Sequence, residues 1–402
     1  MASSKWKSFG ELNELLVQKD KVIFWGASNW VEQTLDQLLP KDHFIVDNSK
    51  LNQGADYMGI DVVAPSSILQ EDKKRIFIII TTSNYMSVID ELTEMGFVMG
   101  EDYCCSPLLN ERRNRDDLKN YTTNIILSSP VHYADEKAGG GLYRCALPSG
   151  DITKLVSGKG RGLTKAGDLY AWIDMLKGIV LLDNNWQEVD VIELDQNSEP
   201  HGICYCKNRE ALYVAQPGRD SVAVYDIKTK KKLTELFISN KWAGNKKDNH
   251  HVNDLYVHGD SLFVSLFSFS GNWANEAYDG GVIEIDLKTE SIIGPVVSNL
   301  WMPHSVKRIE GKLFYLDSMR GALKTMNWSS LGVFPNFVRG LAKDNQYFVI
   351  GASEHRYPEK IKNDSMNISL NSGFYVFDPD SKMSNFFSVP QINSVHDLLI
   401  EQ

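Results

Sequence analysis

The chain has few cysteines and no excess of positive charge, and each shortage excludes a class of protein. Its 402 residues include five cysteines, an odd number whose spacings match no disulfide framework and no zinc ribbon. We therefore expect buried free thiols and a cytoplasmic protein. The net charge of −10 disfavours nucleic acid and anionic membranes as partners, because a basic surface is needed to bind phosphate groups.

Long apolar segments and several common motifs are also missing. No apolar run is long enough to span a bilayer, and the first residues lack the apolar core of a signal peptide. The sequence contains neither a Gly-x-Ser-x-Gly nucleophile turn nor a Gly-Lys-Ser/Thr phosphate loop. We expect no membrane span, and the simplest serine hydrolases and nucleoside triphosphatases are excluded.

What the sequence does contain is a sixfold repeat. Each copy opens with a His or Arg and continues into a short apolar strand, and repeats at this period are typical of radial architectures. The pattern predicts a six-bladed β-propeller over residues 120–402. The six segments are Arg161-Gly-Leu-Thr-Lys, His201-Gly-Ile-Cys-Tyr, His251-Val-Asn-Asp-Leu-Tyr-Val, His304-Ser-Val-Lys-Arg-Ile, Arg339-Gly-Leu-Ala-Lys and His396-Asp-Leu-Leu-Ile.

The last repeat ends at the C-terminus without a partner strand after it. Strand-like segments without an inner strand occur at residues 124–128 and from Gly140 onward. We therefore expect the C-terminal strand to be the innermost strand of a blade whose outer strands come from residues 120–158. Such closure removes the exposed edge that an open ring would leave.

Residues 1–109 alternate strand and helix patterns, which predicts a small doubly wound, Rossmann-like α/β domain. Gly26 follows the first strand and Asp47 follows the second, as in a nucleotide site, but Ser28 and Val31 replace the later glycines of that fingerprint. The alternative is that Gly26 only forms a tight turn and Asp47 only caps a strand. Residues 110–119 are charged and read as an exposed linker or short helix.

Three segments of this domain resemble a Rossmann-like family that accompanies sugar acetyltransferases, sugar methyltransferases and glycan-assembly proteins. They are Asp47-Asn48-Ser-Lys, Gly59-Ile-Asp-Val-Val-Ala-Pro-Ser and Phe77-Ile-Ile-Ile-Thr-Thr-Ser. The resemblance implies a nucleotide or nucleotide-sugar as cofactor or ligand. The residues it implicates are Gly26, Ser28, Asn29, Asp47 and Asn48.

The residues that open the repeats should share one face of the propeller with the loops after the second strands. Those loops carry further polar and aromatic side chains, which are Trp273, Glu276, Asp317, Arg320, Glu354, His355, Arg356, Arg219 and His132. Loops on a rigid scaffold are where binding groups concentrate. We therefore expect the functional site at this face.

Three interpretations of the opening residues remain. In the first, Arg and His bind an anionic sugar and a histidine acts as acid or base. In the second, His201, His251 and His304 hold a divalent metal with an open position. In the third, the histidines only bond neighbouring blades together. Calcium bound by Asn253, Asp254, Asp317 and Asp397 has no closely spaced carboxylates to support it.

Several phrases of the propeller resemble an uncharacterised bacterial propeller family. They are Met302-Pro-His-Ser-Val-Lys, Leu316-Asp-Ser-Met-Arg-Gly, Phe337-Val-Arg-Gly-Leu-Ala and Gly351-Ala-Ser-Glu-His-Arg. The resemblance implies no activity. It implies one site made of Pro303, His304, Ser305, Asp317, Arg320, Arg339, Glu354 and Arg356.

The leading hypothesis is a transferase or lyase of surface-glycan assembly that acts on a nucleotide-activated or anionic sugar. The alternatives are a non-catalytic sugar-binding scaffold or sensor and a metal-dependent lyase or hydrolase. Partners would be the small-molecule sugar and a second copy of the chain or a glycan-biosynthesis protein. His304 and His251 are the acid/base candidates, and Asp317 or Glu354 would orient a histidine. The substrate-binding candidates are Arg161, His201, Asn253, Arg320, Arg339, Arg356, His396 and Trp273, and no metal ligands are assigned.

Overall fold

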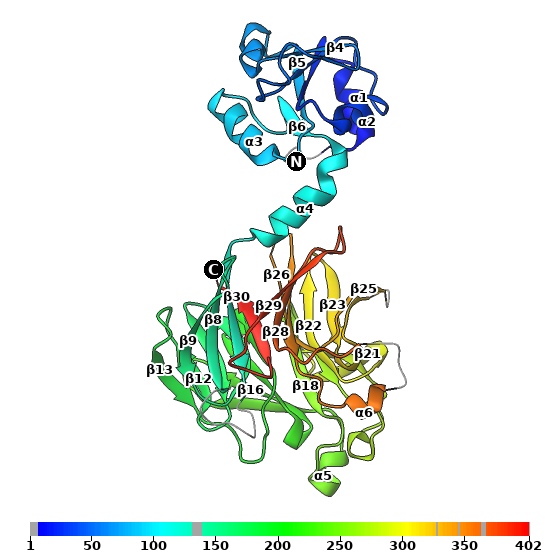
Figure 1. The fold of residues 1–402 in the computed structure, drawn as a ribbon. Coiled ribbons are helices and arrows are strands. Elements are labelled where there is room, and N and C mark those ends of the chain that lie inside the picture. Colours follow the sequence, from blue (N-terminus) through cyan, green and yellow to red (C-terminus); the bar gives the residue numbers. More distant parts are fainter. Residues whose placement is uncertain (1–6, 131–138, 327–328, 345, 363–366, 402) are drawn as a thin grey trace. The chain divides into compact units, whose positions relative to one another are not determined.

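The computed structural model describes residues 7–130, 139–326, 329–344, 346–362 and 367–401. Contacts divide the chain into two compact units, Met1–Asp117 and Leu118–Gln402. The division falls inside helix α4 (Asn110–Lys119), the charged segment that we expected to form a linker or short helix (Figure 1). Within the described residues, no helix combines the length and the apolar character needed to cross a membrane.

The amino-terminal unit contains a mixed sheet with the strand order β3-β4-β2-β1-β5-β6. All neighbours pair in parallel except β3 and β4. Among the parallel strands the chain order reverses between β1 and β5, as it does in doubly wound sheets. The strands are β1 (Lys21–Trp25), β2 (His43–Val46), β3 (Asp56–Tyr57), β4 (Ile60–Val63), β5 (Ile76–Ile80) and β6 (Tyr103–Cys105).

Helices cover both faces of this sheet. Helices α1 (Phe9–Leu16) and α2 (Asn29–Leu35) pack on one face, and α3 (Tyr85–Glu94) packs on the other. Strand β5 is buried along its whole length because both of its faces are covered. The mixed sheet with helices agrees with the α/β prediction, whereas a Rossmann-like function of this unit stays a prediction.

The second unit is a six-bladed β-propeller, as predicted, and each blade is a four-stranded antiparallel sheet. Blade 1 contains β10 (Gly160–Ala166), β11 (Leu169–Asp174), β12 (Gly178–Leu182) and β13 (Glu188–Ile192). Blade 2 contains β14 (Ile203–Cys206), β15 (Ala211–Gln216), β16 (Ser221–Asp226) and β17 (Lys232–Phe237). Blade 3 contains β18 (Val252–His258), β19 (Ser261–Leu266), β20 (Gly280–Asp286) and β21 (Ser291–Leu300).

The chain continues through two further blades before it closes the ring. Blade 4 contains β22 (Pro303–Ile309), β23 (Lys312–Asp317), β24 (Ala322–Thr325) and β25 (Ser330–Val333). Blade 5 contains β26 (Phe337–Lys343), β27 (Phe348–Ser353), β28 (Gly373–Phe377) and β29 (Ser384–Ser388). Blade 6 combines β30 (Asp397–Ile400) with β7 (Thr123–Ser129), β8 (Gly141–Leu147) and β9 (Asp151–Ser157).

The C-terminal strand closes the propeller, which confirms the prediction from the unpaired last repeat. Strand β30 pairs with β7, so that Asp397 lies opposite Ser128. Glu401 then fastens the end of the chain, because it accepts hydrogen bonds from Arg144 Nε at 2.8 Å and from Trp186 Nε1 at 3.1 Å. The closed ring leaves no inner strand unpaired among the described residues.

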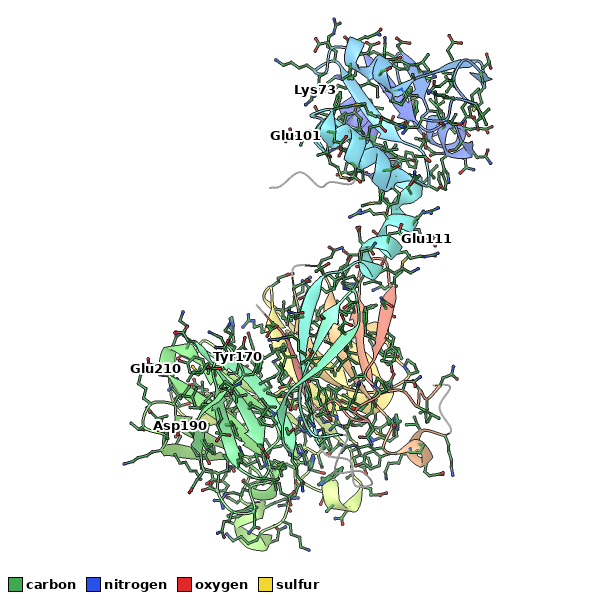
Figure 2. The ribbon with its side chains drawn as sticks, turned by 60° about the vertical axis from the view of Figure 1, so that its left-hand side comes forward. Lys73, Glu101, Glu111, Tyr170, Asp190 and Glu210 are labelled. Atoms are coloured by element: carbon green, nitrogen blue, oxygen red, sulfur yellow. The ribbon has the colours of Figure 1, made fainter. Side chains whose placement is uncertain are left out.

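Buried second strands and close contacts between inner strands hold the blades together. Strands β15 and β27 are buried at every residue because each blade packs against its neighbours. Gly162 N donates to His201 O at 2.9 Å, and a Cβ on Gly162 would stand only 2.7 Å from that oxygen. Charged side chains lie toward the outside, as Figure 2 shows for Asp190 on β13 and for Glu210.

Candidate ligand-binding site at the propeller axis

Residues from five blades surround one cavity at the axis of the propeller. The cavity has a volume of about 190 Å³. Its lining includes one residue near the start of the inner strand in each of these blades. These five residues, together with His396, are called the axial ring; the five are Arg161, His201, Asn253, His304 and Arg339. The remaining lining residues are Glu199, His251, Phe267, Trp273, Met302, Phe337, Arg356 and Tyr357.

Asn253, and not His251, occupies the axial-ring position of blade 3. Gly162 N donates to His201 O in the next blade, and Gly202 N donates to Asn253 O in the blade after that. In each case the N–H of the residue after an axial-ring residue donates to the carbonyl of the axial-ring residue in the next blade, so Asn253 is the counterpart of His201. The expected position of His251 is therefore offset by two residues from the axial-ring position. His251 stands at the start of that strand with a φ of 50°.

Arg161 connects His201 and His396 across the axis. His201 Nδ1 donates to Glu199 O at 2.8 Å, which leaves Nε2 to accept from Arg161 at 2.8 Å. Arg161 also lies 3.2 Å from His396 Nε2. Burial, followed by the charge of Arg161, lowers the pKa of both histidines well below the usual value. Both are therefore neutral acceptors near pH 7.

His304 is also held as a neutral imidazole. Its Nδ1 lies 2.9 Å from Met302 O, to which it donates, and 2.8 Å from Ser318 Oγ. Burial is the main reason that the pKa of His304 is lowered, and the guanidinium of Arg339 adds to the effect. His304 is therefore better suited to accept a hydrogen bond at Nε2 than to serve as a general acid near neutral pH.

The cavity combines buried positive charge with polar atoms that lack partners. Arg339 is 2% exposed and hydrogen-bonds Ser394, which also accepts from Arg356 at 3.2 Å. Burial, then the charges of Arg356 and Arg161, pull the pKa of Arg339 down. Among the described residues, Arg339 Nε and Asn253 Oδ1 are buried without a hydrogen-bond partner. A bound anion would relieve the repulsion between these guanidinium groups.

His251 has the arrangement of a general base. Its Nδ1 is hydrogen-bonded to Asp248 Oδ2, and its backbone N–H donates to Asp248 Oδ1 at 2.8 Å. The ring packs against both Phe267 and Trp273, with centroid distances of 4.3 and 4.6 Å. Because Nδ1 carries the proton, Nε2 has the lone pair that can take a proton from a ligand.

A buried carboxylate, that of Asp220, fixes the loop that carries this pair. Asp220 is 0% exposed and accepts from Asn249 N at 2.9 Å, His250 N at 2.8 Å and Asn249 Nδ2 at 2.7 Å. Burial raises the pKa of Asp220, and the three donors oppose that rise. Sequence reasoning missed both acids. The three-residue spacing between Asp248 and His251 was a usable signal, whereas nothing in the sequence pointed to Asp220.

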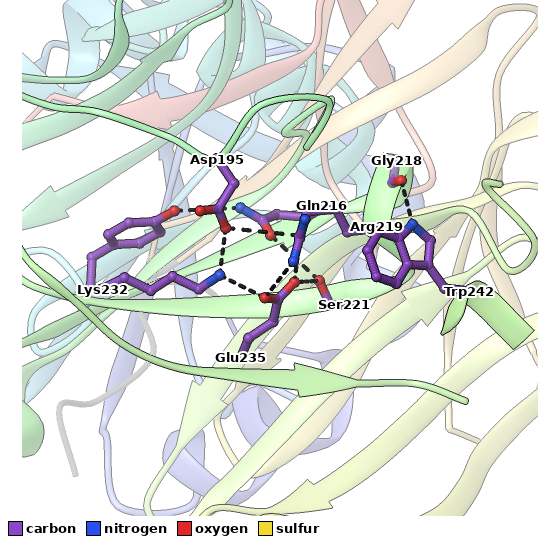
Figure 3. Close-up of polar contacts among 9 residues, drawn as sticks. Asp195, Gln216, Gly218, Arg219, Ser221, Lys232, Glu235 and Trp242 are labelled. Atoms are coloured by element: carbon purple, nitrogen blue, oxygen red, sulfur yellow. Dashed lines mark hydrogen bonds and ion pairs between the residues drawn. The ribbon is translucent and has the colours of Figure 1, made fainter. Parts of the chain in front are cut away.

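A second polar network supports the same loop from blade 2. Arg219 binds Glu235 through two hydrogen bonds of 2.7 and 2.9 Å, and Ser221 and Lys232 also donate to Glu235 (Figure 3). Burial alone would raise the pKa of Glu235, but these donors outweigh it and lower the pKa to about 2. Arg219 also lies 4.7 Å from the ring of Trp242, in helix α5 (Lys241–Asn245). Arg219 therefore supports α5 and does not line the axial cavity.

Asp317, Arg320 and Glu354 lie outside the cavity lining. Asp317 accepts from Trp301 N at 2.8 Å, Arg320 at 2.9 Å and Lys324 at 2.8 Å, so its expected pairing with a histidine does not form. Arg320 is held by this ion pair and by the carbonyl of Asn299. Glu354 is exposed and therefore does not orient a histidine. Glu276 pairs with Lys360, and His132 lies outside the described residues.

The geometry offers no metal centre within the described part of the chain. No three His, Cys, Asp or Glu residues there are grouped so that they could hold a metal ion. Arg161 occupies the Nε2 of His201, and the nearby guanidinium groups repel a cation. Asp254 and Asp397 accept from the backbone N–H groups of Ser305 at 2.8 Å and Leu163 at 2.9 Å, so they bond neighbouring blades instead of facing calcium.

In the amino-terminal unit, the expected nucleotide-binding residues bond to neighbouring residues of the same unit. Asp47 accepts from Ala27 N at 2.8 Å and from Ser49 N at 2.7 Å. Ser28 caps α2 and donates to Thr81 O at 2.6 Å, and Asn48 bonds Trp25 and Glu91. Gly26 has a φ of 114° and lies at the tight turn before Asn29. These contacts account for the residues locally, and their binding of a nucleotide stays a prediction.

Comparisons with known proteins extend only to the fold and to one family model. The model of a domain of unknown function (DUF4915) matches residues 234–395, from β17 to the residue before His396. This match is in line with the resemblance to an uncharacterised propeller family. No curated protein matches the sequence. The resemblance of the amino-terminal unit to domains of sugar-modifying enzymes has no counterpart here and stays a prediction.

Solved structures are similar at low identity. A chain of a nidogen/laminin complex has a TM-score of 0.51 at 10% identity, over 70% of this chain and 98% of that chain. A protein of unknown function from Bacteroides caccae has a TM-score of 0.47 at 11% identity, over 69% and 98% of the two chains. A gluconolactonase from Xanthomonas campestris has a TM-score of 0.44 at 15% identity, over 65% and 85%. At this low identity, the similarity to the chain of the nidogen/laminin complex supports the propeller fold and nothing about function.

Proposed function

We propose that the axial cavity binds a small anionic sugar, namely a sugar acid, and that His251 acts on it as a general base. The observation that carries this proposal is the Asp248–His251 pair beside the guanidinium groups of Arg339 and Arg356 in one cavity. A carboxylate would neutralise the guanidinium groups, and the neighbouring Nε2 of His251 would be placed to take a proton.

The size and the lining of the cavity favour a single sugar unit. Its volume of about 190 Å³ lies below the range of about 300–1,000 Å³ for drug-sized ligands. Trp273 and Phe337 offer apolar surface for a sugar ring, while Asn253 and His304 offer hydrogen-bonding groups. Glu199 is the one acidic residue among the described lining residues, and it is exposed.

The arrangement supports a lyase reaction on a uronic acid unit. His251 Nε2 would take the proton from the carbon next to the carboxylate. The freed electron pair would form a carbon–carbon double bond while the neighbouring carbon–oxygen bond breaks, and the departing oxygen would take a proton from the imidazolium or from water. Arg339 and Arg356 would stabilise the negative charge that develops on the carboxylate.

A second candidate is a sugar-binding protein without catalysis. It is favoured by the lowered pKa of His304, which makes the unbonded Nε2 of this residue a neutral acceptor suited to binding. This candidate uses the same cavity and differs in the role of His251 alone. A part in surface-glycan assembly depends on the amino-terminal resemblance and stays a prediction.

The test compares glucuronate and galacturonate with neutral glucose. Ligands that bind only the folded protein raise its melting temperature, so the uronates should raise it and glucose should not. Proton magnetic resonance in heavy water should then show exchange of the C5 proton of the uronate with the wild type but not with His251→Gln. Binding without exchange supports the non-catalytic candidate. A response to glucose equal to that of the uronates would refute an anion site.

A further inference from the structure

A second cavity opens at the opposite end of the inner strands. It has a volume of about 300 Å³ and is lined from β10, β18, β22, β26 and β30. Its residues follow the axial ring by two or more positions along each strand, so it is distinct from the cavity at the axial ring. The lining consists of Leu163, Thr164, Lys165, Tyr256, Lys307, Arg308, Ile309, Leu341, Ala342, Lys343, Leu398, Leu399 and Ile400.

The described lining is basic and contains no acidic residue. Lys343 pairs with Glu310 at 2.8 Å, and Lys165 lies 5.3 Å from the ring of Tyr170. Arg308 donates to Gly311 O at 3.4 Å. Lys307 differs from these three residues, because its ammonium group has no hydrogen bond or ion pair with any described residue. It is the cationic group in this lining that a ligand can engage without breaking an existing contact.

The surroundings of Lys307 keep it charged. Burial alone would lower the pKa of its ammonium group, but the charges of Asp397 and Asp254 outweigh burial and raise it. Neither carboxylate forms an ion pair with Lys307. The oxygens of Asp254 accept from Leu255 and Ser305, and those of Asp397 accept from Leu163 and Leu398, at 2.8 to 2.9 Å. Lys307 is partly exposed, so its ammonium group can donate charge-assisted hydrogen bonds to an anionic ligand atom that enters the cavity.

The other lining residues define the body of that ligand. Ile309, Leu399 and Ile400 contribute partly exposed apolar side chains, whereas the other apolar residues Leu163, Leu341 and Leu398 are already buried between the blades. A fully hydrated ion such as inorganic phosphate gains nothing from such walls, whereas an apolar group buried against them is stabilised. We propose that this second cavity binds a small amphipathic carboxylate, with its carboxylate at Lys307 and its apolar part against Ile309, Leu399 and Ile400. The proposal is independent of the axial-ring function.

The test uses the full chain with labelled leucine and isoleucine methyl groups and benzoate as the probe. Benzoate should shift the methyl resonances of Ile309, Leu399 and Ile400, and neutral benzyl alcohol at the same concentration should not. Lys307→Gln should weaken benzoate binding about tenfold or more, since it removes a charge-assisted contact. Lys312→Gln, an exposed lysine on the adjacent strand, is the matched control and should bind as the wild type does.

Several results would overturn the proposal. They include unshifted methyl groups at millimolar benzoate, equal shifts with benzyl alcohol, and unchanged affinity in folded Lys307→Gln. Arg356→Gln separates the two cavities, because it should weaken uronate binding at the axial ring and leave benzoate binding intact. Loss of benzoate binding in Arg356→Gln alone would assign the carboxylate to the axial ring and reject the second site. If Lys307→Gln does not fold, the wild-type comparison of the two probes still decides.

Discussion

Asp248 holds both the backbone N–H and the ring Nδ1 of His251, so one carboxylate sets the position and the tautomer of the imidazole. The side chain of His251 is mostly buried, with 14% exposed, and it lines the axial cavity. A histidine held only to bond neighbouring blades would not need a carboxylate partner of its own.

Replacing Asp248 with Asn should separate binding from turnover. The amide preserves the shape of the side chain but removes the charge that stabilises the imidazolium formed during proton transfer. We expect the C5 exchange rate of bound uronate to fall by about 10²–10⁴-fold, with little change in the concentration of uronate that gives half of the thermal shift. Equal losses in binding and exchange would contradict the role assigned to Asp248.

Asp220 should act as a positioning residue for the loop that carries Asp248 and His251. Asp220→Ala removes the acceptor for three buried donors, so we expect unfolding to become easier by about 2–4 kcal/mol in urea denaturation. The C5 exchange rate should also fall, although Asp220 does not line the cavity. Asp226 is the matched control, because it accepts from two backbone N–H groups of an exposed turn in the same blade. Asp226→Ala should leave exchange unchanged, and an equal effect of both substitutions would argue against positioning.

Much of the propeller could be predicted because its strands repeat a physical pattern. Each blade needs a buried second strand and an inner strand with a polar residue at its start. Both can be recognised in the sequence, as an apolar run and as a polar residue before a short apolar segment. The unpaired strand at residues 397–400 predicted the closure correctly, because hydrogen-bonding groups at a sheet edge need a partner.

The contacts of individual site residues could not be predicted in the same way. Asn253, which is not a histidine, takes the axial-ring position of blade 3, so matching the repeats by their histidines could not find it. Asp317 follows its strand as a catalytic acid could, yet two cations and a backbone N–H occupy it. Such pairings join residues that are distant in sequence or separated by a loop, so they depend on the folded coordinates.

The turn around Asp47 gives a test for the amino-terminal unit. Asp47→Ala removes a carboxylate that accepts from two backbone N–H groups, and we expect this unit to lose about 1–3 kcal/mol of stability. Hydrogen exchange of the amides of Ala27 and Ser49 should report the loss. Asp61→Ala, at an exposed position on β4, is the control and should change little. If Asp47 served a nucleotide alone, its removal would leave these amides protected and would abolish only the thermal shift caused by a nucleotide-sugar.

Acidification should destabilise the propeller through its buried histidines. The folded pKa values of His201, His304 and His396 lie below the unfolded value, so the unfolded chain binds more protons. The stability is therefore fully present above the unfolded pKa of about 6.5 and falls by about 1.4 kcal/mol per histidine for each pH unit below it. The pKa of Asp397, raised to about 7 by burial, contributes in the opposite direction, as does Asp254, whose pKa burial also raises. Asp220, whose pKa burial raises, is a third such acid, and His355, whose pKa burial lowers, is a fourth such histidine, so the histidines still outnumber the acids.

Urea denaturation of the wild type and of His304→Gln between pH 7.5 and 5.5 measures this effect. The wild type should lose stability as the pH falls below about 6.5, and below that pH the variant should lose about 1.4 kcal/mol less for each pH unit because one of the titrating groups is gone. An anion bound at the axial ring favours the protonated imidazoles, so a uronate should also reduce the loss in the wild type. If the wild type and His304→Gln responded equally to pH, His304 could not be held as the neutral, buried imidazole that its contacts with Met302 and Ser318 describe.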